Sequence, residues 1–233
     1  MAILTKALPI IFNTVYTTPR RILISSILDA AGGSLKKREL LYDVINYVLL
    51  AHSGQYRKGD KFKNPNNDEE NIKYLTHQYM VFIQGYLEGI PFEQQIALLL
   101  HDTIEDGTKY FHPDFNKTRA IIRKDIAVIC DQYGDGFGGA VLSRINYLTN
   151  KAGLKPHEKK AWQLDRFENM PTIDQNNKLR DKLANMWDTF HNAPDCWSDE
   201  KKADDLAFAF DLLAVANDPP QYIEDLLLFL SNQ

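Results

Sequence analysis

The chain has 233 residues, a formal net charge of -4, 44% hydrophobic residues and 25% charged residues. This length and composition suit a globular protein with a buried core, and we expect one domain over residues 1–233. The charge balance excludes the strongly basic class of proteins that bind nucleic acid. No apolar run approaches the length of a membrane span, so no membrane partner is expected.

Cysteine usage and the N-terminal segment both point to the cytoplasm. Cys130 and Cys196 lie far apart and form no CxxC pair, which argues against a disulfide framework and suits a reducing compartment. The short apolar run after Lys6 contains Pro9 and leads to Arg20 rather than to a small-residue cleavage site, so it is not typical of a signal peptide. We therefore predict a cytoplasmic protein.

Apolar residues recur at the spacing of an α-helix through most of the chain. The predicted helices cover, in chain order, residues 38–52, 73–88, 92–104, 117–133, 138–148, 157–168, 175–191, 201–216 and 220–231. Turn signals separate them, among them Gly107, Gly153 and the pair Pro219-Pro220. No segment alternates as a strand would, so the fold class is predicted to be all-α, with about eight to ten helices.

Some polar and glycine-rich segments allow more than one interpretation. Residues 59–73 form a loop-like polar insert, which is either a surface loop or a lid over a pocket, since it lies between two candidate site segments. Residues 134–139 are rich in glycine, but no strand precedes them and no Lys-Ser/Thr pair follows, so a turn is predicted rather than a phosphate loop. His112, His157 and His191 lack partners at ligand spacing and are predicted to be surface or capping residues.

The most informative segment is the acidic end of the predicted helix 92–104. His101 and Asp102 follow an apolar run, and an ionisable pair is costly to bury there unless a partner or a metal compensates it. Glu105 and Asp106 follow at i+4 from these two residues. Three carboxylates crowded at one helix end favour a bound cation, although a solvated acidic helix end with an incidental histidine is the simpler alternative.

Two other predicted helices carry further candidate ligands. Asp181 and Asn185 share one face of the helix 175–191, and His77 lies on an apolar face of the helix 73–88, where a core histidine is the simpler interpretation. Together His77, His101, Asp102 and Asp181 offer two nitrogen and two oxygen donors. Such a set suits Mn, Fe, Zn or Mg with positions left for water, and its convergence in space is a hypothesis.

Four motifs in this order resemble those of the RelA/SpoT-type HD hydrolases, which remove the 3′-diphosphate from the alarmones ppGpp and pppGpp. The matching segments are Ala51 to Lys58 (AHSGQYRK), Tyr74 to His77 (YLTH), Ala97 to Asp106 (ALLLHDTIED) and Lys178 to Met186 (KLRDKLANM). The resemblance covers roughly residues 38–190 and leaves no room for a synthetase domain. It implies an HD-domain helical bundle, a stand-alone alarmone hydrolase, and extra terminal helices that brace the core or form a contact in a homo-oligomer.

The resemblance also implies roles for individual residues. The metal ligands, usually of Mn²⁺, would be His77, His101, Asp102 and Asp181. Glu105 and Asp106 would orient and deprotonate a metal-activated water and assist the leaving group. Substrate binding would fall to Arg57 and Lys58, which contact the purine and the phosphates, and to Asn185 near the sugar.

Departures from the family pattern concern the substrate more than the reaction. Gln78 stands where the family usually has proline, Arg180 where it has alanine, and Ala184 where it often has histidine or tyrosine. Every proposed ligand is nevertheless in place. One alternative is therefore an HD phosphohydrolase of another nucleotide or of an adenosine alarmone, which could act as antitoxin to an alarmone-synthesising toxin. A further alternative is a non-catalytic HD module that binds a nucleotide, against which the pair Glu105-Asp106 argues.

Overall fold

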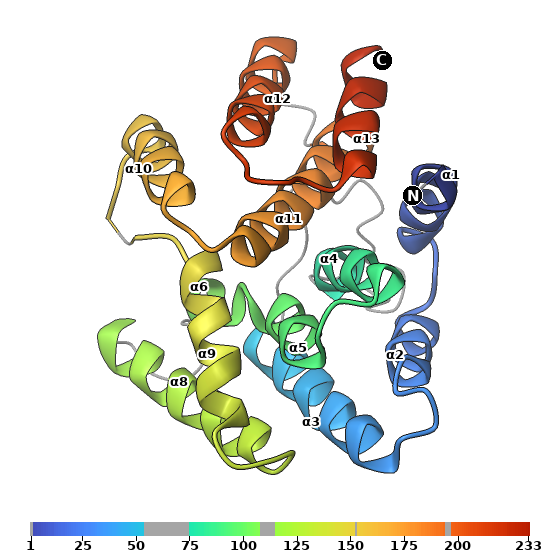
Figure 1. The fold of residues 1–233 in the computed structure, drawn as a ribbon, viewed down its shortest axis with the longest axis vertical. Coiled ribbons are helices and arrows are strands. Elements are labelled where there is room, and N and C mark those ends of the chain that lie inside the picture. The colour runs from blue at the N-terminus through green and yellow to red at the C-terminus, as the bar shows by residue number, and fades with distance from the viewer. Residues whose placement is uncertain (1, 54–74, 108–114, 152, 194–196) are drawn as a thin grey trace. The chain divides into compact units, whose positions relative to one another are not determined.

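All secondary structure in the described part of the chain is helical. The computed structural model describes residues 2–53, 75–107, 115–151, 153–193 and 197–233 (Figure 1). Within these ranges it has twelve α-helices, counting the single turn α6, and no strand. The all-α prediction is confirmed. The helices outnumber the predicted eight to ten because two form before residue 30 and because the predicted helix 92–104 is broken into two.

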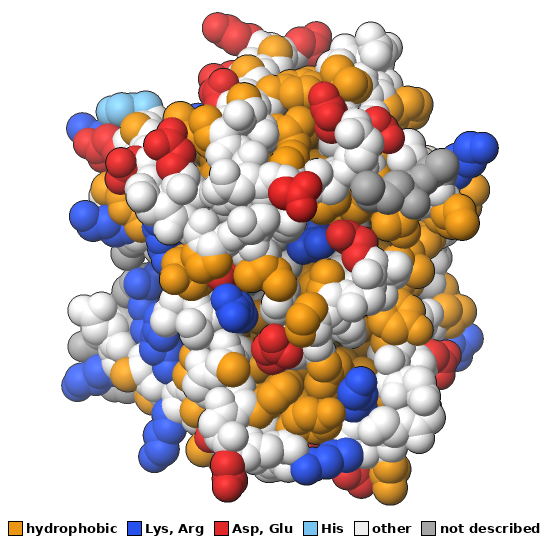
Figure 2. Space-filling view, in the orientation of Figure 1, with side chains coloured by type: hydrophobic (Ala, Val, Ile, Leu, Met, Phe, Trp, Pro, Cys, Tyr) orange, Lys and Arg blue, Asp and Glu red, His pale blue; other side chains and the backbone are white. Residues whose placement is uncertain are grey.

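The helices fall into two compact units, and each is described by itself. The terminal unit contains Met1–Tyr16 and Asn150–Gln233, and the central unit contains Thr17–Tyr56 and Lys73–Thr149. One domain over residues 1–233 stays a prediction. No helix in the described ranges is long and apolar enough to cross a membrane. On the face shown in Figure 2, acidic and basic side chains both lie among apolar ones.

The central unit is built around a short apolar helix. Its elements are α2 (Arg20–Asp29), α3 (Leu35–Ala51), α4 (Leu75–Glu88), α5 (Phe92–Leu100), α6 (Thr103–Asp106), α8 (Phe115–Asp131) and α9 (Phe137–Leu148). Helix α5 packs against α3, α4 and α9. Residues 96–100 are all apolar and at most 1% exposed, as a helix that is hydrophobic on every side requires.

Close approach of α4 to α5 depends on a glycine. A Cβ on Gly85 would lie 2.5 Å from Ile90 Cδ1 and 2.8 Å from Leu98 Cδ1, so glycine lets the two helices meet without displacing these side-chain ends. On the other side of the unit, the Tyr47 hydroxyl of α3 donates to Asp125 Oδ2 of α8 at 3.0 Å. Burial, followed by this hydrogen bond, raises the pKa of Tyr47. The first contact concerns α4, which carries His77, and α5, which ends just before His101, and the hydrogen bond joins α3 to α8.

The terminal unit consists of α1 (Ala2–Val15), α10 (Pro156–Glu168), α11 (Thr172–His191), α12 (Asp199–Ala214) and α13 (Gln221–Ser231). Helix α11 packs against α12 and α13, and α1 packs against α13. Trp187 of α11 is fully buried, meets Phe12 edge-on with ring centroids 5.4 Å apart, and donates from Nε1 to Asn13 Oδ1 at 3.1 Å. His191, in the last turn of α11, stacks on Trp187 at a centroid distance of 4.5 Å, and its Nδ1 is 3.1 Å from the Trp187 carbonyl oxygen.

Candidate metal centre

His101 lies directly after α5, where the backbone leaves carbonyl groups without helical partners. Its Nδ1 is 2.8 Å from the Leu98 carbonyl oxygen. A carbonyl can only accept a hydrogen bond, so Nδ1 carries the proton and donates it. In the neutral ring the lone pair is then on Nε2, which is the arrangement found when a histidine binds a metal.

His77 of α4 meets His101, just after α5, inside the central unit. Both side chains are 1% exposed or less, and their Nε2 atoms are 3.2 Å apart. Two imidazole nitrogens at this distance share either a proton or a cation. The sequence left open whether His77 is a core histidine or a ligand. This contact places His77 beside the pair His101-Asp102.

Asp102 adds a carboxylate oxygen to the two nitrogens. Its Oδ2 is 3.3 Å from His101 Nε2 and 3.6 Å from His77 Nε2. The circle through the three atoms has a radius of about 2.0 Å, while divalent metals bind nitrogen and carboxylate oxygen at about 2.0–2.2 Å. The three atoms would therefore all be within bonding distance of one divalent metal. The residues present fit a divalent metal.

Glu105 and Asp106 lie one turn further along, on α6. Their backbone amides donate to the Asp102 carbonyl at 3.0 and 2.8 Å. Both side chains are half-buried. The predicted continuous helix 92–104 is wrong at this point, because α5 ends at Leu100 and α6 begins at Thr103. The hydrogen bonds across the break nevertheless keep the acidic pair one turn after Asp102, as the sequence indicated.

Gly107 fixes the position of α6. A Cβ there would run into the Thr103 carbonyl oxygen and would lie 3.2 Å from Ala51 Cβ and 3.3 Å from Ile122 Cδ1. The chain thus passes close to α3 and α8 immediately after the acidic pair. Side-chain volume is excluded at this residue although its φ of -69° suits any amino acid.

Asp181 belongs to the terminal unit, where α11 holds it from two directions. Its Oδ2 accepts from Lys178 Nζ at 2.8 Å, and its Oδ1 accepts from Asn185 Nδ2 at 2.7 Å. The side chains of Lys178 and Asp181 are 8% and 7% exposed. Asn185 was expected near the sugar of a substrate; here its amide contacts a predicted ligand. Lys178 carried no predicted role, although its i, i+3 spacing to Asp181 would have suggested the contact.

The structure therefore brings three of the four predicted ligands together within the central unit. Asp181 is fixed within its own unit, and its place in the ligand set stays a prediction. Arg57, Lys58, His112 and the insert 59–73 lie outside the described residues.

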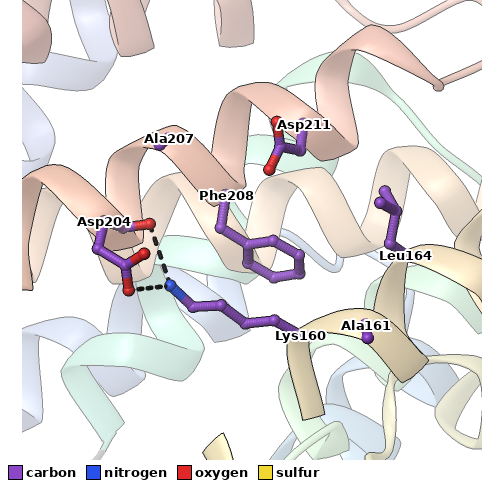
Figure 3. A pocket seen from close by; sticks show the side chains of 7 residues that line it. All are labelled: Lys160, Ala161, Leu164, Asp204, Ala207, Phe208 and Asp211. Carbon is purple, nitrogen blue, oxygen red and sulfur yellow. Dashed lines mark hydrogen bonds and ion pairs between the residues drawn. The ribbon is translucent and has the colours of Figure 1, made fainter. Parts of the chain in front are cut away.

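A shallow pocket between α10 and α12 of the terminal unit holds none of the predicted site residues. Figure 3 shows Lys160 reaching along its floor to Asp204, below the ring of Phe208. Lys182 Nζ lies 4.7 Å from the centroid of the same ring, and burial, with the neighbouring Lys178 cation, lowers the pKa of Lys182 to about 8. The ion pair of Lys160 with Asp204 joins α10 to α12 at this pocket.

Comparison with known proteins gives a likeness in structure. No family model matches the sequence, and no curated protein matches it. A solved structure of a metazoan orthologue of SpoT matches with a TM-score of 0.64 over 86% of this chain and 96% of that chain, at 21% identity. The two proteins share a fold. The metazoan protein hydrolyses ppGpp and plays a role in starvation responses. The all-α helical bundle expected from the sequence is thus the architecture observed, and this SpoT orthologue has the same fold.

Proposed function

We propose that the protein is a metal-dependent hydrolase of ppGpp and pppGpp that releases the 3′-diphosphate as pyrophosphate. The observation that carries the proposal is the convergence of His77 Nε2, His101 Nε2 and Asp102 Oδ2 within 3.2 to 3.6 Å of one another. The fold shared with a SpoT orthologue that hydrolyses ppGpp supports this substrate class.

Asp181 is proposed as the fourth ligand, and Mn²⁺ as the metal. A set of two imidazoles and two carboxylates suits a borderline or hard divalent ion. Asp181 offers a carboxylate that is buried and already held in one orientation, which is what a ligand requires. When bound, such a metal lowers the pKa of water and offsets negative charge on the diphosphate.

Glu105 and Asp106 are proposed to handle the protons. One carboxylate accepts a proton from the attacking water, whose oxygen bonds to the phosphorus attached to the 3′-oxygen. The bond from that phosphorus to the 3′-oxygen breaks, and the leaving oxygen takes up a proton from the other carboxyl group. The products are then GDP or GTP and pyrophosphate, and one water is consumed for each bond broken.

Access to the cluster favours this division of roles. The two histidine side chains are 1% exposed, whereas Asp102 is 20% exposed and Glu105 and Asp106 are half-buried. A substrate therefore reaches the cluster from the side of the three carboxylates. Arg57 and Lys58 are proposed to bind the purine and phosphates, because cations are needed to offset the charge of a tetraphosphate.

The test is an assay of the purified protein with Mn²⁺ and, separately, ppGpp, pppGpp, pppApp, GTP and ATP. We expect pyrophosphate release from ppGpp and pppGpp, its abolition in Asp102→Asn, and wild-type rates in the exposed-turn control Asp135→Asn. Hydrolysis of pppApp alone would indicate an adenosine alarmone instead. Binding of nucleotides without any turnover would contradict the enzymatic proposal and favour a binding module.

A further inference from the structure

Lys178 and Asp181 form an ion pair on the buried face of α11. Lys178 Nζ donates to Asp181 Oδ2 at 2.8 Å, and both side chains are less than one-tenth exposed. The pair closes one helical turn, since the two residues are three apart. Asn185 closes the next turn by donating to Oδ1 of the same carboxylate at 2.7 Å. Each oxygen of Asp181 is therefore engaged by a different donor on the same helix.

This ion pair has a geometric consequence. A buried ion pair adds little net stability over apolar side chains of equal volume, because both charges lose their water. Donors one turn before and one turn after Asp181 do, however, fix the rotation of its carboxylate. A carboxylate oxygen has two acceptor positions, so Oδ1 can accept from Asn185 and still bind an ion.

We propose that Lys178 is a positioning residue for the metal ligand Asp181. By engaging Oδ2, the ammonium leaves Oδ1 as the ligand oxygen and holds the carboxylate ready before an ion arrives. This inference rests on the proposed function, because that function assigns Asp181 to the metal. Lys182, the next lysine on α11, has a different role, since its ammonium lies over the Phe208 ring.

The test compares Lys178→Met, Lys178→Arg and Lys182→Met, the last removing the same charge from the same helix. The dissociation constant of Mn²⁺ is measured by calorimetry on protein freed of metal with a chelator. Loss of a residue that orients a ligand weakens metal binding about 10–100-fold. We expect that loss in Lys178→Met and recovery to within about threefold of wild type in Lys178→Arg, whose N–H groups can replace the donor. In Lys182→Met, which removes only a Coulomb attraction to Asp181, we expect a change of less than about threefold.

A second readout separates positioning from general structural damage. In Lys178→Met, more Mn²⁺ is needed for half-maximal hydrolysis, while kcat at saturating Mn²⁺ stays near that of wild type. Lys178→Gln is measured in parallel with an intermediate loss expected, so that failure of the methionine variant to fold, judged by circular dichroism, leaves the test in place. Unchanged Mn²⁺ affinity in a folded Lys178 variant that lacks the ammonium would overturn the role of Lys178 alone. A wild-type protein that bound no Mn²⁺ would overturn the metal site and this role together.

Discussion

Replacing Gly107 by alanine adds one methyl group at the point where the chain leaves the acidic pair. The new Cβ has three neighbours: the Thr103 carbonyl oxygen in direct collision, Ala51 Cβ at 3.2 Å and Ile122 Cδ1 at 3.3 Å. Ile122 Cδ1 ends a flexible side chain and can move aside, but the Thr103 oxygen belongs to the backbone and cannot. The backbone of α6 must therefore shift to make room, carrying Glu105 and Asp106 with it.

The size of the effect follows from this crowding. Overpacking a filled site by one methyl group costs about 1–3 kcal/mol. A shift of about 1 Å in a catalytic group reduces the rate by about 100-fold. We therefore expect Gly107→Ala to lower the free energy of unfolding by about 1–3 kcal/mol and, under the proposed function, to reduce ppGpp hydrolysis far more than this stability loss alone would.

The assay is urea unfolding followed by circular dichroism, together with pyrophosphate release from ppGpp. Gly139→Ala is the matched control, because Gly139 lies exposed in α9 with nothing within 4 Å of an added Cβ. In a helix this exchange stabilises by up to about 1 kcal/mol. A Gly107→Ala protein as stable as wild type would refute the packing argument. The expected loss of stability in Gly107→Ala together with wild-type ppGpp hydrolysis would refute the role of α6 in catalysis.

Three further predictions concern the core, the metal and a half-buried lysine. Trp187→Ala, which empties a fully buried site beside Phe12, is expected to lower the free energy of unfolding by about 3–5 kcal/mol in urea, and a loss below 1 kcal/mol would contradict the packing described. Mn²⁺ at about 100 times its dissociation constant should stabilise the wild type by about 2.7 kcal/mol and raise its Tm, but should leave His101→Ala unchanged; equal shifts in both would place the ion elsewhere. Lys182→Met should gain stability over the wild type at pH 7, because the pKa of Lys182 falls to about 8 in the folded protein from 10.5 when unfolded. Below pH 8, Lys182 is protonated in both the folded and the unfolded protein, and the cost of burying its charge is fully present. The stability gain of Lys182→Met should therefore fade between pH 8 and 10.5. A gain that persisted above pH 10.5 would point to packing instead.

Helical periodicity predicted where most helices lie, because each buries one apolar face. The prediction failed at His101, where nothing in the local residue types opposes a continuous helix. At the break the His101 ring engages the Leu98 carbonyl, and a few residues later Gly107 packs against α3 and α8. Such tertiary contacts leave no trace in the spacing of apolar residues.

The candidate site was predictable in its residue types but not in its distances. Periodicity placed His77 on an apolar helix face, where a core histidine and a metal ligand have the same spacing. The 3.2 Å contact between His77 Nε2 and His101 Nε2 shows that His77 lies beside another candidate ligand. The buried ion pair of Lys178 with Asp181 was not predicted, because an i, i+3 pair on a helix is usually exposed. Only the fold shows that both side chains are buried. The roles of Arg57 and Lys58 stay predictions.

The central claim is tested most directly by following the reaction of ppGpp with the wild-type protein and Mn²⁺ by phosphorus NMR. The account predicts GDP and pyrophosphate in equal amounts, with neither formed after chelation of the metal or in Asp102→Asn. Release of orthophosphate in place of pyrophosphate, or turnover that survives chelation, would contradict a metal-dependent 3′-pyrophosphohydrolase built on His77, His101 and Asp102.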